Sequence, residues 1–194
     1  MLNKADPEEL IPIEELGEEP ESFTNYTGVE TDPKAVDILE GYLSKRWMRE
    51  FGTWNELKAY LEGEPVLNKL VCLLRIKDDG SEKRRIFIDA KMSRVSAASR
   101  KQYKQELPRQ TGLITETISL LAVRREAEEL AYLVADAEEA FWQVPLDPSE
   151  RRFYCAILRM PGGSTRYLVF TRTAQGSRGG PLTWAQVFGL ISRC

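Results

Sequence analysis

A chain of 194 residues with 42% apolar residues can bury a core of its own, yet it contains no histidine and only three cysteines. The lack of histidine excludes imidazole-based catalytic triads and histidine-ligated metals, so any chemistry must use carboxylates, lysine, arginine or backbone groups. The widely spaced Cys72, Cys155 and Cys194 form no CxxC pair, which favours reduced thiols in an intracellular protein over a zinc module.

The net charge of −3 hides an uneven distribution along the chain. Residues 1–65 hold 6 Lys/Arg and 16 Asp/Glu, whereas residues 66–194 hold 21 Lys/Arg and 14 Asp/Glu. A basic portion of this size suits a nucleic-acid partner, although ordinary scatter of charge is the alternative explanation. Neither a secretory leader nor a long apolar span is present, so we expect a soluble protein with no membrane partner.

Residues 1–31 are acidic and poor in aromatic residues, and we expect them to be disordered. Asp32 followed by Pro33 is typical of a helix N-cap and first helical position. Apolar residues then recur at helical spacing and predict one helix that ends at Gly52. These residues are Val36, Leu39, Leu43, Trp47 and Phe51.

Thr53 and Glu56 have the spacing of a capping box, which predicts a second, shorter helix that ends at Gly63. Neither helix carries an evident reactive group. Residues 32–65 are therefore predicted to form a helical arm with a packing role.

The pattern changes after this arm. Residues 70–76 and 85–89 are predicted to be strands, and the turn sequence at residues 78–80 predicts that they pair as a hairpin. Residues 83–109 hold nine Lys/Arg against two acidic residues. A solvated basic face is one interpretation, and a site for a polyphosphate or a nucleic-acid backbone is the other.

Residues 113–129 suit an amphipathic helix, with Ile114, Ile118 and Leu121 predicted to point inward. Six uncharged residues, 130–135, then suit a buried strand that ends at Asp136. From this stretch alone two interpretations of that carboxylate stay open. It is either a metal ligand beside an aromatic pocket, or the N-cap of a short helix whose capping box is completed by Glu139.

A second hairpin is predicted from residues 152–159 and 166–172, which flank a Pro-Gly-Gly turn. Residues 173–181 are rich in glycine and precede an apolar helix predicted at residues 182–192. The glycines suit either a close backbone approach to a ligand or simply a flexible start to the helix.

Taken in order, these blocks resemble the reverse transcriptase domain of retroviruses and LTR retrotransposons over residues 66–194. Residues 83–89 (KRRIFID) resemble the K-x-R-x-x-x-D fingers hairpin, and residues 107–109 (LPR) resemble the link between fingers and palm. Residues 133–148 (LVADAEEAFWQVPLDP) resemble the first palm motif, L-D-x-x-x-A-[FY]-x-Q-[IV]-P-L. Residues 175–184 (QGSRGGPLTW) resemble the second palm block, Q-G-x-x-x-x-P-x-x-[FW].

This resemblance implies an α+β fold with reverse-transcriptase-like fingers and a partial, ferredoxin-like palm. The fingers would span residues 66–129, and the partial palm with an inserted fingers hairpin would span residues 130–194. The acidic helical arm would precede both.

The resemblance also implies roles for individual residues. Asp136 would be the first catalytic aspartate and would hold Mg²⁺, or Mn²⁺, together with the backbone carbonyl of Ala137. Phe141 would be the steric gate that selects deoxynucleotides, and Arg85 would clamp the triphosphate. Further nucleotide contacts would come from Lys77, Lys83, Gln175 and Gly176. Contacts to the nucleic acid would come from Arg84, Lys91, Arg94, Arg178 and Pro181.

Three departures from the family limit this interpretation. The second acidic pair of the family, the Y-x-D-D hairpin, has no counterpart, since no Asp or Glu follows Glu150. Arg94 stands where the family often has asparagine, in a loop that matches more weakly. The first 65 residues match no known block.

We therefore expect a fragment of a retroelement RNA-directed DNA polymerase that does not polymerise by itself. Its partners in the full-length enzyme would be an RNA or DNA template-primer and deoxynucleoside triphosphates. The alternative is a non-catalytic retroelement remnant that binds nucleic acid or another protein.

Overall fold

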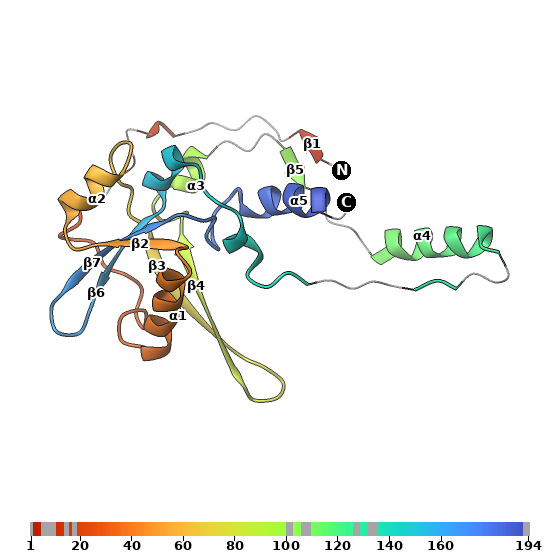
Figure 1. Ribbon diagram of the computed structural model, residues 1–194, viewed down its shortest axis with the longest axis horizontal. Coiled ribbons are helices and arrows are strands. Elements are labelled where there is room, and N and C mark those ends of the chain that lie inside the picture. Colours follow the sequence, from red (N-terminus) through yellow and green to blue (C-terminus); the bar gives the residue numbers. More distant parts are fainter. Residues whose placement is uncertain are drawn as a thin grey trace. The chain divides into compact units, whose positions relative to one another are not determined.

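The computed structural model describes residues 2–4, 11–13, 16, 19–99, 103–105, 110–125, 129–131 and 136–191 (Figure 1). The chain divides into two compact units. The larger contains residues 7–100 and 139–194, and the smaller contains residues 1–6 and 101–138. Helices and small antiparallel sheets together make an α+β fold, which confirms that part of the predicted fold class, while the reverse-transcriptase-like arrangement stays a prediction.

The larger unit is built on a three-stranded antiparallel sheet. Its central strand, β7 (Thr165–Phe170), pairs with β6 (Cys155–Arg159) on one side and with β2 (Met48–Phe51) on the other. The β6–β7 pair confirms the second predicted hairpin. All the residues of β6 except Arg159 are buried, so this strand lies inside the core.

The first predicted hairpin is also confirmed. Strands β3 (Lys69–Ile76) and β4 (Glu82–Asp89) pair over their full length, from Lys69 opposite Asp89 to Ile76 opposite Glu82. The base of the hairpin is packed, since Leu70 and Ile86 are fully buried, but its far end extends beyond the core. There the apolar side chains of Leu73, Leu74 and Ile76 are exposed.

Aromatic rings fill the centre of the core. The ring of Trp142, from the short helical turn η2 (Ala140–Gln143), stacks on Trp47 at 5.8 Å and lies 4.3 Å from the ring of Tyr42. Phe170 of β7 completes the group at 5.6 Å from Trp142. This cluster joins the sheet to α1 (Pro33–Ser44), the helix that carries Tyr42.

Helix α1 starts as predicted but ends earlier. The Asp32 side chain accepts a hydrogen bond from the backbone N–H of Lys34, and Pro33 occupies the first helical position. The predicted extension to Gly52 is wrong, because the helix ends at Ser44 and Arg46 adopts a left-handed φ of 57°. Phe51, which continued the helical spacing, instead lies in β2, and Trp47 lies just before that strand, since pairing with β7 outweighs local periodicity.

Helix α2 (Trp54–Tyr60) confirms the predicted capping box. The backbone N–H of Glu56 donates to the Thr53 hydroxyl at 3.2 Å, and the Glu56 carboxylate accepts from the backbone N–H of Thr53 at 3.3 Å. The helix ends at Tyr60, slightly before the predicted stop at Gly63.

The later part of the acidic N-terminal segment differs from the expectation of disorder. Phe23 and Val29 are fully buried in the core of the larger unit. The Asn25 amide donates to the carbonyl of Ile157 at 2.6 Å, and its oxygen accepts from the backbone N–H of Leu70 at 2.9 Å. The acidic average composition of residues 1–31 predicted disorder, but these few side chains are enough to fix the later part of the segment to the larger unit.

In the smaller unit, β1 (Leu2–Lys4) pairs with β5 (Tyr103–Gln105), and α4 (Gln110–Val123) matches most of the helix predicted at residues 113–129. The predicted inward direction of Ile114, Ile118 and Leu121 is wrong: all three are exposed, and no residue of α4 is buried. Apolar side chains lie around much of this helix, so they do not form a single packed stripe. Residues 107–109 and 132–135 lie outside the described residues.

The remaining elements of the larger unit are α3 (Val95–Ala98), the helical turn η3 (Pro148–Phe153) and α5 (Gly180–Ile191). Helix α5 confirms the apolar helix predicted near the C-terminus. Among the described residues, no helix is both long enough and apolar enough to cross a membrane.

Gly176 fixes the approach of the glycine-rich segment to β4. The backbone N–H of Ile88 donates to the carbonyl of Gln175 at 2.9 Å. Gly176 has a φ of 102°, and a Cβ atom there would overlap the carbonyl oxygen of Ile88. A close contact between backbones therefore requires glycine at this position.

Replacement of Gly176 by alanine should lower the free energy of unfolding by about 3 kcal/mol, because overlap with Ile88 adds to the strain of the left-handed backbone. Gly162 is a matched control, since it has a φ of 110° in the β6–β7 turn but no atom within 4 Å of the added Cβ. Gly162→Ala should cost only about 1 kcal/mol. Urea unfolding of both variants measures the difference, and equal losses would contradict the close-packing argument.

Candidate functional site

The two faces of the β3–β4 hairpin have different chemistry, because successive side chains of a strand point to opposite sides. The register pairs Leu73 with Arg85 and Arg75 with Lys83, so these four side chains lie on one face. Arg84 points to the other face, which also carries the buried Ile86 and Ile88 nearer the base of the hairpin.

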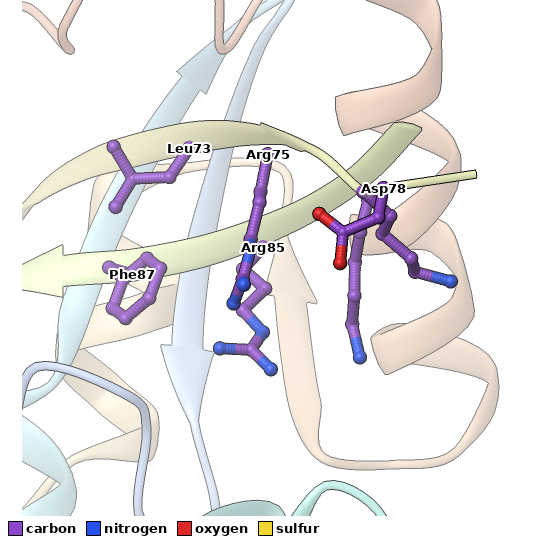
Figure 2. A pocket seen from close by; sticks show the side chains of 7 residues that line it. Leu73, Arg75, Asp78, Arg85 and Phe87 are labelled. Carbon is purple, nitrogen blue, oxygen red and sulfur yellow. The ribbon is translucent and has the colours of Figure 1, made fainter. Parts of the chain in front are cut away.

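A cavity of about 430 Å³ lies on the first of these faces. It is lined by Leu73, Arg75, Lys77, Asp78, Lys83, Arg85 and Phe87. Figure 2 shows Leu73 and Phe87 side by side on the two strands, with Arg75 and Arg85 extending together from the same face. We call this surface the cationic face: four positive charges and one carboxylate beside an apolar floor.

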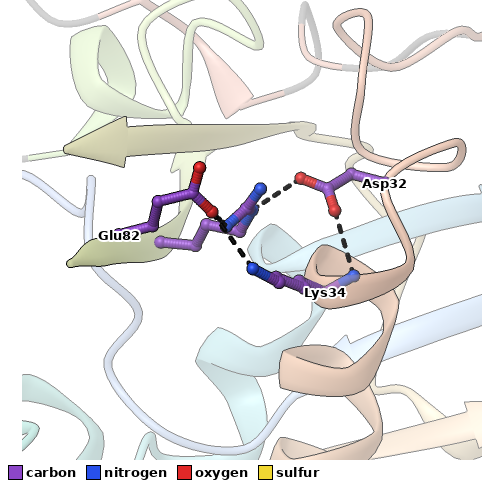
Figure 3. Close-up of polar contacts among 4 residues, drawn as sticks. Asp32, Lys34 and Glu82 are labelled. Carbon is purple, nitrogen blue, oxygen red and sulfur yellow. Dashed lines mark hydrogen bonds and ion pairs between the residues drawn. The ribbon is translucent and has the colours of Figure 1, made fainter. Parts of the chain in front are cut away.

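On the opposite face of the hairpin, Arg84 forms ion pairs with carboxylates. The guanidinium of Arg84 donates to the carboxylate of Asp32 at 2.6 Å and to that of Glu82 at 2.8 Å, and its side chain is only 14% exposed. Lys34 also binds Glu82, at 3.1 Å (Figure 3). The hydrogen bonds that Arg84 donates to Glu82 and Asp32 raise the pKa of Arg84, and the bond to Asp32 in turn lowers the pKa of that carboxyl.

Arg84 therefore joins the hairpin to the N-terminus of α1, with its charge balanced by two acids. The sequence had grouped it with the nucleic-acid contacts, but it does not line the cavity that contains Lys83 and Arg85. Three of the predicted nucleotide-binding residues do lie together there, namely Lys77, Lys83 and Arg85.

Two other predicted nucleotide-binding residues, Gln175 and Gly176, lie against β4. Gln175 and Gly176 contact β4 at Ile88, as described above. Burial raises the pKa of Tyr42, which the charge of Glu139 raises further and that of Arg85 opposes.

Phe141, the predicted steric gate, belongs to η2 and lies beside Gly180, at the start of α5. Pro181 occupies the first turn of that helix and is exposed. Phe141 and the start of α5 are thus neighbours within the larger unit.

The remaining predicted nucleic-acid contacts have local structural roles. Arg178 donates to the carbonyls of Ser96 and Ser99 at 2.8 and 3.3 Å, which attaches the glycine-rich segment to α3. Arg94 adopts a left-handed φ of 63° at the start of α3. The backbone N–H of Lys91 donates to the Asp89 carboxylate, and its side chain is exposed.

Asp136 and Ala137 belong to the smaller unit. Asp136 is exposed and lies in no helix or strand. The short turn that follows begins at Ala140 with Glu139 at its N-cap, so Asp136 does not cap it.

The described residues contain no group of three or more His, Cys, Asp or Glu side chains that could hold a metal ion. Mg²⁺ takes six oxygen ligands, and proteins often supply one or two carboxylates while waters and substrate phosphates supply the rest. The predicted ligands, Asp136 and Ala137, would contribute one carboxylate and one backbone carbonyl, so the magnesium site stays a prediction and we assign no chemical step to it.

Sequence reasoning missed part of the cationic face. Arg75, Leu73 and Phe87 line the cavity but were not among the predicted site residues. The alternation of side chains along a strand could have identified Arg75, because a hairpin that turns at residues 78–80 places Arg75 opposite Lys83, on the same face.

No protein-family model matches this chain, and a search of curated proteins finds no significant match.

The Asp32–Arg84 pair makes stability depend on pH in a defined direction. Because the folded-state pKa of Asp32 lies below its unfolded value of 3.8, the pair stabilises the fold above that pH. The contribution is lost as pH falls from about 4 through the lower folded-state pKa. We expect Asp32→Asn, which keeps an N-capping oxygen, to lose less stability than the wild type between pH 5 and pH 3, about the range of carboxyl titration.

Urea unfolding over this pH range measures the effect. Asp37→Asn is the control, since Asp37 is exposed on the same helix and its carboxylate has no hydrogen-bond or ion-pair partner among the described residues. If Asp32→Asn and Asp37→Asn gave the same pH profile, the Arg84 pair would not be the cause.

Proposed function

We propose that this chain is a reverse-transcriptase-like fingers region with part of a palm, and that its cationic face binds the phosphates of a nucleic acid or a nucleotide. The observation that carries the proposal is the convergence of Arg75, Lys77, Lys83 and Arg85 around one cavity. Two of these, Lys83 and Arg85, are the basic residues of the K-x-R-x-x-x-D block.

The chemistry of the cavity supports a phosphate ligand. Arginine and lysine bind phosphate oxygens through charge-assisted hydrogen bonds, and arginine does so in a bidentate geometry. Asp78 is the only carboxylate among the lining residues, so the cavity keeps a positive balance. A polyanion approaching it is attracted and releases counterions as it binds.

The apolar floor adds a second element of recognition. Phe87 and Leu73 lie next to the arginines, and an aromatic ring beside guanidinium groups offers a surface for a base or sugar. A free inorganic anion would leave this floor unused. The arrangement therefore favours a ligand that carries both phosphate and an apolar ring.

Two candidate functions share this face. In an RNA-directed DNA polymerase it would position the incoming triphosphate or the template strand, because phosphoryl transfer depends mainly on positioning and electrostatics. In a non-catalytic remnant it would only bind nucleic acid.

We expect the purified chain to bind a labelled DNA or RNA oligonucleotide, and Lys83→Gln/Arg85→Gln to weaken that binding about tenfold at moderate salt. The slope of log affinity against log salt should fall by about 1.4 for a single strand and about 1.8 for duplex DNA, because two side chains no longer neutralise a phosphate each. Fluorescence anisotropy at several salt concentrations measures both quantities.

Lys34→Gln/Lys58→Gln is the charge-matched control. Both lysines are exposed and ion-paired, to Glu82 at 3.1 Å and to Glu64 at 2.8 Å, and neither lines the cavity of the cationic face. This variant should bind like the wild type. Equal affinity of all three proteins would contradict a role for the cationic face, and titration with a deoxynucleoside triphosphate would show whether a free nucleotide suffices.

A further inference from the structure

A second group of cations surrounds a different cavity in the larger unit. This cavity, of about 420 Å³, is lined by Arg46, Met48, Arg49, Pro145, Arg151, Thr171 and Arg172. All its positive charges are arginines, and its lining contains no acidic residue. None of the four had been assigned a role by the sequence or by the proposed function.

The backbone around this cavity is held by hydrogen bonds between three distant segments. The backbone N–H of Thr171 donates to the carbonyl of Trp47 at 2.9 Å, and the Thr171 hydroxyl donates to the carbonyl of Arg46, also at 2.9 Å. The backbone N–H of Leu146 donates to the carbonyl of Thr171 at 3.0 Å, next to a β-bridge between Pro145 and Arg172. The four arginines therefore extend from one connected framework.

Three of the guanidinium groups are also held by contacts of their own. Arg151 donates to the hydroxyl of Tyr60 at 2.7 Å, and Arg49 lies over the ring of the same tyrosine at 5.0 Å. Arg172 donates to the carbonyl of Gln143 at 3.3 Å. Holding these side chains reduces the conformational entropy that a ligand would otherwise have to remove.

Ion pairs do not neutralise these arginines within the described part of the chain. Within the described part of the chain, no carboxylate lies at ion-pair distance from any of the four. Arg84 and Arg166, by contrast, each bind two carboxylates. Asp147 is influenced by Arg151, but hydrogen bonds from Ser149 contribute more to its lowered pKa.

We propose that these four residues, which we call the arginine cluster, form an anion site that binds phosphate groups. Four like charges around one hollow repel each other unless an anion lies among them. Guanidinium groups match the geometry of phosphate oxygens better than lysine does. The site is separate from the cationic face and does not depend on the function proposed for it.

The phosphate could come from a nucleic-acid backbone or from a free polyphosphate, and the experiment distinguishes them. Arg49→Gln/Arg172→Gln removes two charges, and Arg49→Lys/Arg172→Lys keeps the charge but loses the bidentate geometry. Binding of inorganic tripolyphosphate is measured by calorimetry, and binding of a labelled single-stranded oligonucleotide by anisotropy. Circular dichroism and thermal unfolding establish that each variant is folded.

For the glutamine variant we expect about a tenfold or greater loss of tripolyphosphate affinity, with an intermediate loss for the lysine variant. If the natural source is a nucleic acid, oligonucleotide affinity falls too, and its salt slope decreases by about 1.4. If only tripolyphosphate binding changes, the site serves a free anion.

Two further proteins separate this proposal from the previous one. Lys83→Gln/Arg85→Gln, altered on the cationic face, should keep the tripolyphosphate affinity that the arginine cluster supplies. Lys34→Gln/Lys58→Gln should bind both probes like the wild type. If the folded Arg49→Gln/Arg172→Gln variant bound both probes as the wild type does, or if the wild type bound neither, the arginine cluster would not be a phosphate site.

Discussion

The alternation of side chains along the β3–β4 hairpin is the constraint on which both the packing and the proposed chemistry depend. One face buries Ile86 and Ile88 at the base and anchors Arg84 to the N-terminus of α1, while the other carries Arg75, Lys83 and Arg85. A shift of register by one residue would exchange the two faces. The core contacts at the base of the hairpin thereby fix which cations meet a ligand.

Local chemistry predicted much of the secondary structure, because some signals need no tertiary partner. The capping box at Thr53, the Asp32-Pro33 helix start and both hairpin turns are encoded within a few residues. The end of α1 was not predictable in this way. Trp47 and Phe51 continue a helical spacing, but residues 48–51 also suit an edge strand. Pairing with β7 decides for the strand, and β7 lies more than a hundred residues further along the chain.

The residues of the two cavities likewise differ in whether a local sequence pattern could predict them. The resemblance to reverse transcriptases singled out Lys83 and Arg85, which line one cavity, since a motif on one hairpin keeps its geometry wherever the hairpin forms. It grouped Arg84 with them because a linear pattern does not separate the two faces of a strand. The arginine cluster is drawn from segments near residues 46, 151 and 172, so only the sheet that joins those segments brings it together.

Neutralisation by neighbouring acids distinguishes two classes of arginine in this chain more clearly than position in the sequence does. Arg84 and Arg166 are each paired with two carboxylates, and they hold elements of the fold together. The paired carboxylates offset the positive charge of these two arginines, so their attraction for an anionic ligand is weak. Arginines that line a cavity and form no ion pair with a carboxylate create a positive electrostatic potential there, which attracts anions. The excess of positive charge beyond residue 65 is therefore informative only after the paired arginines have been set aside.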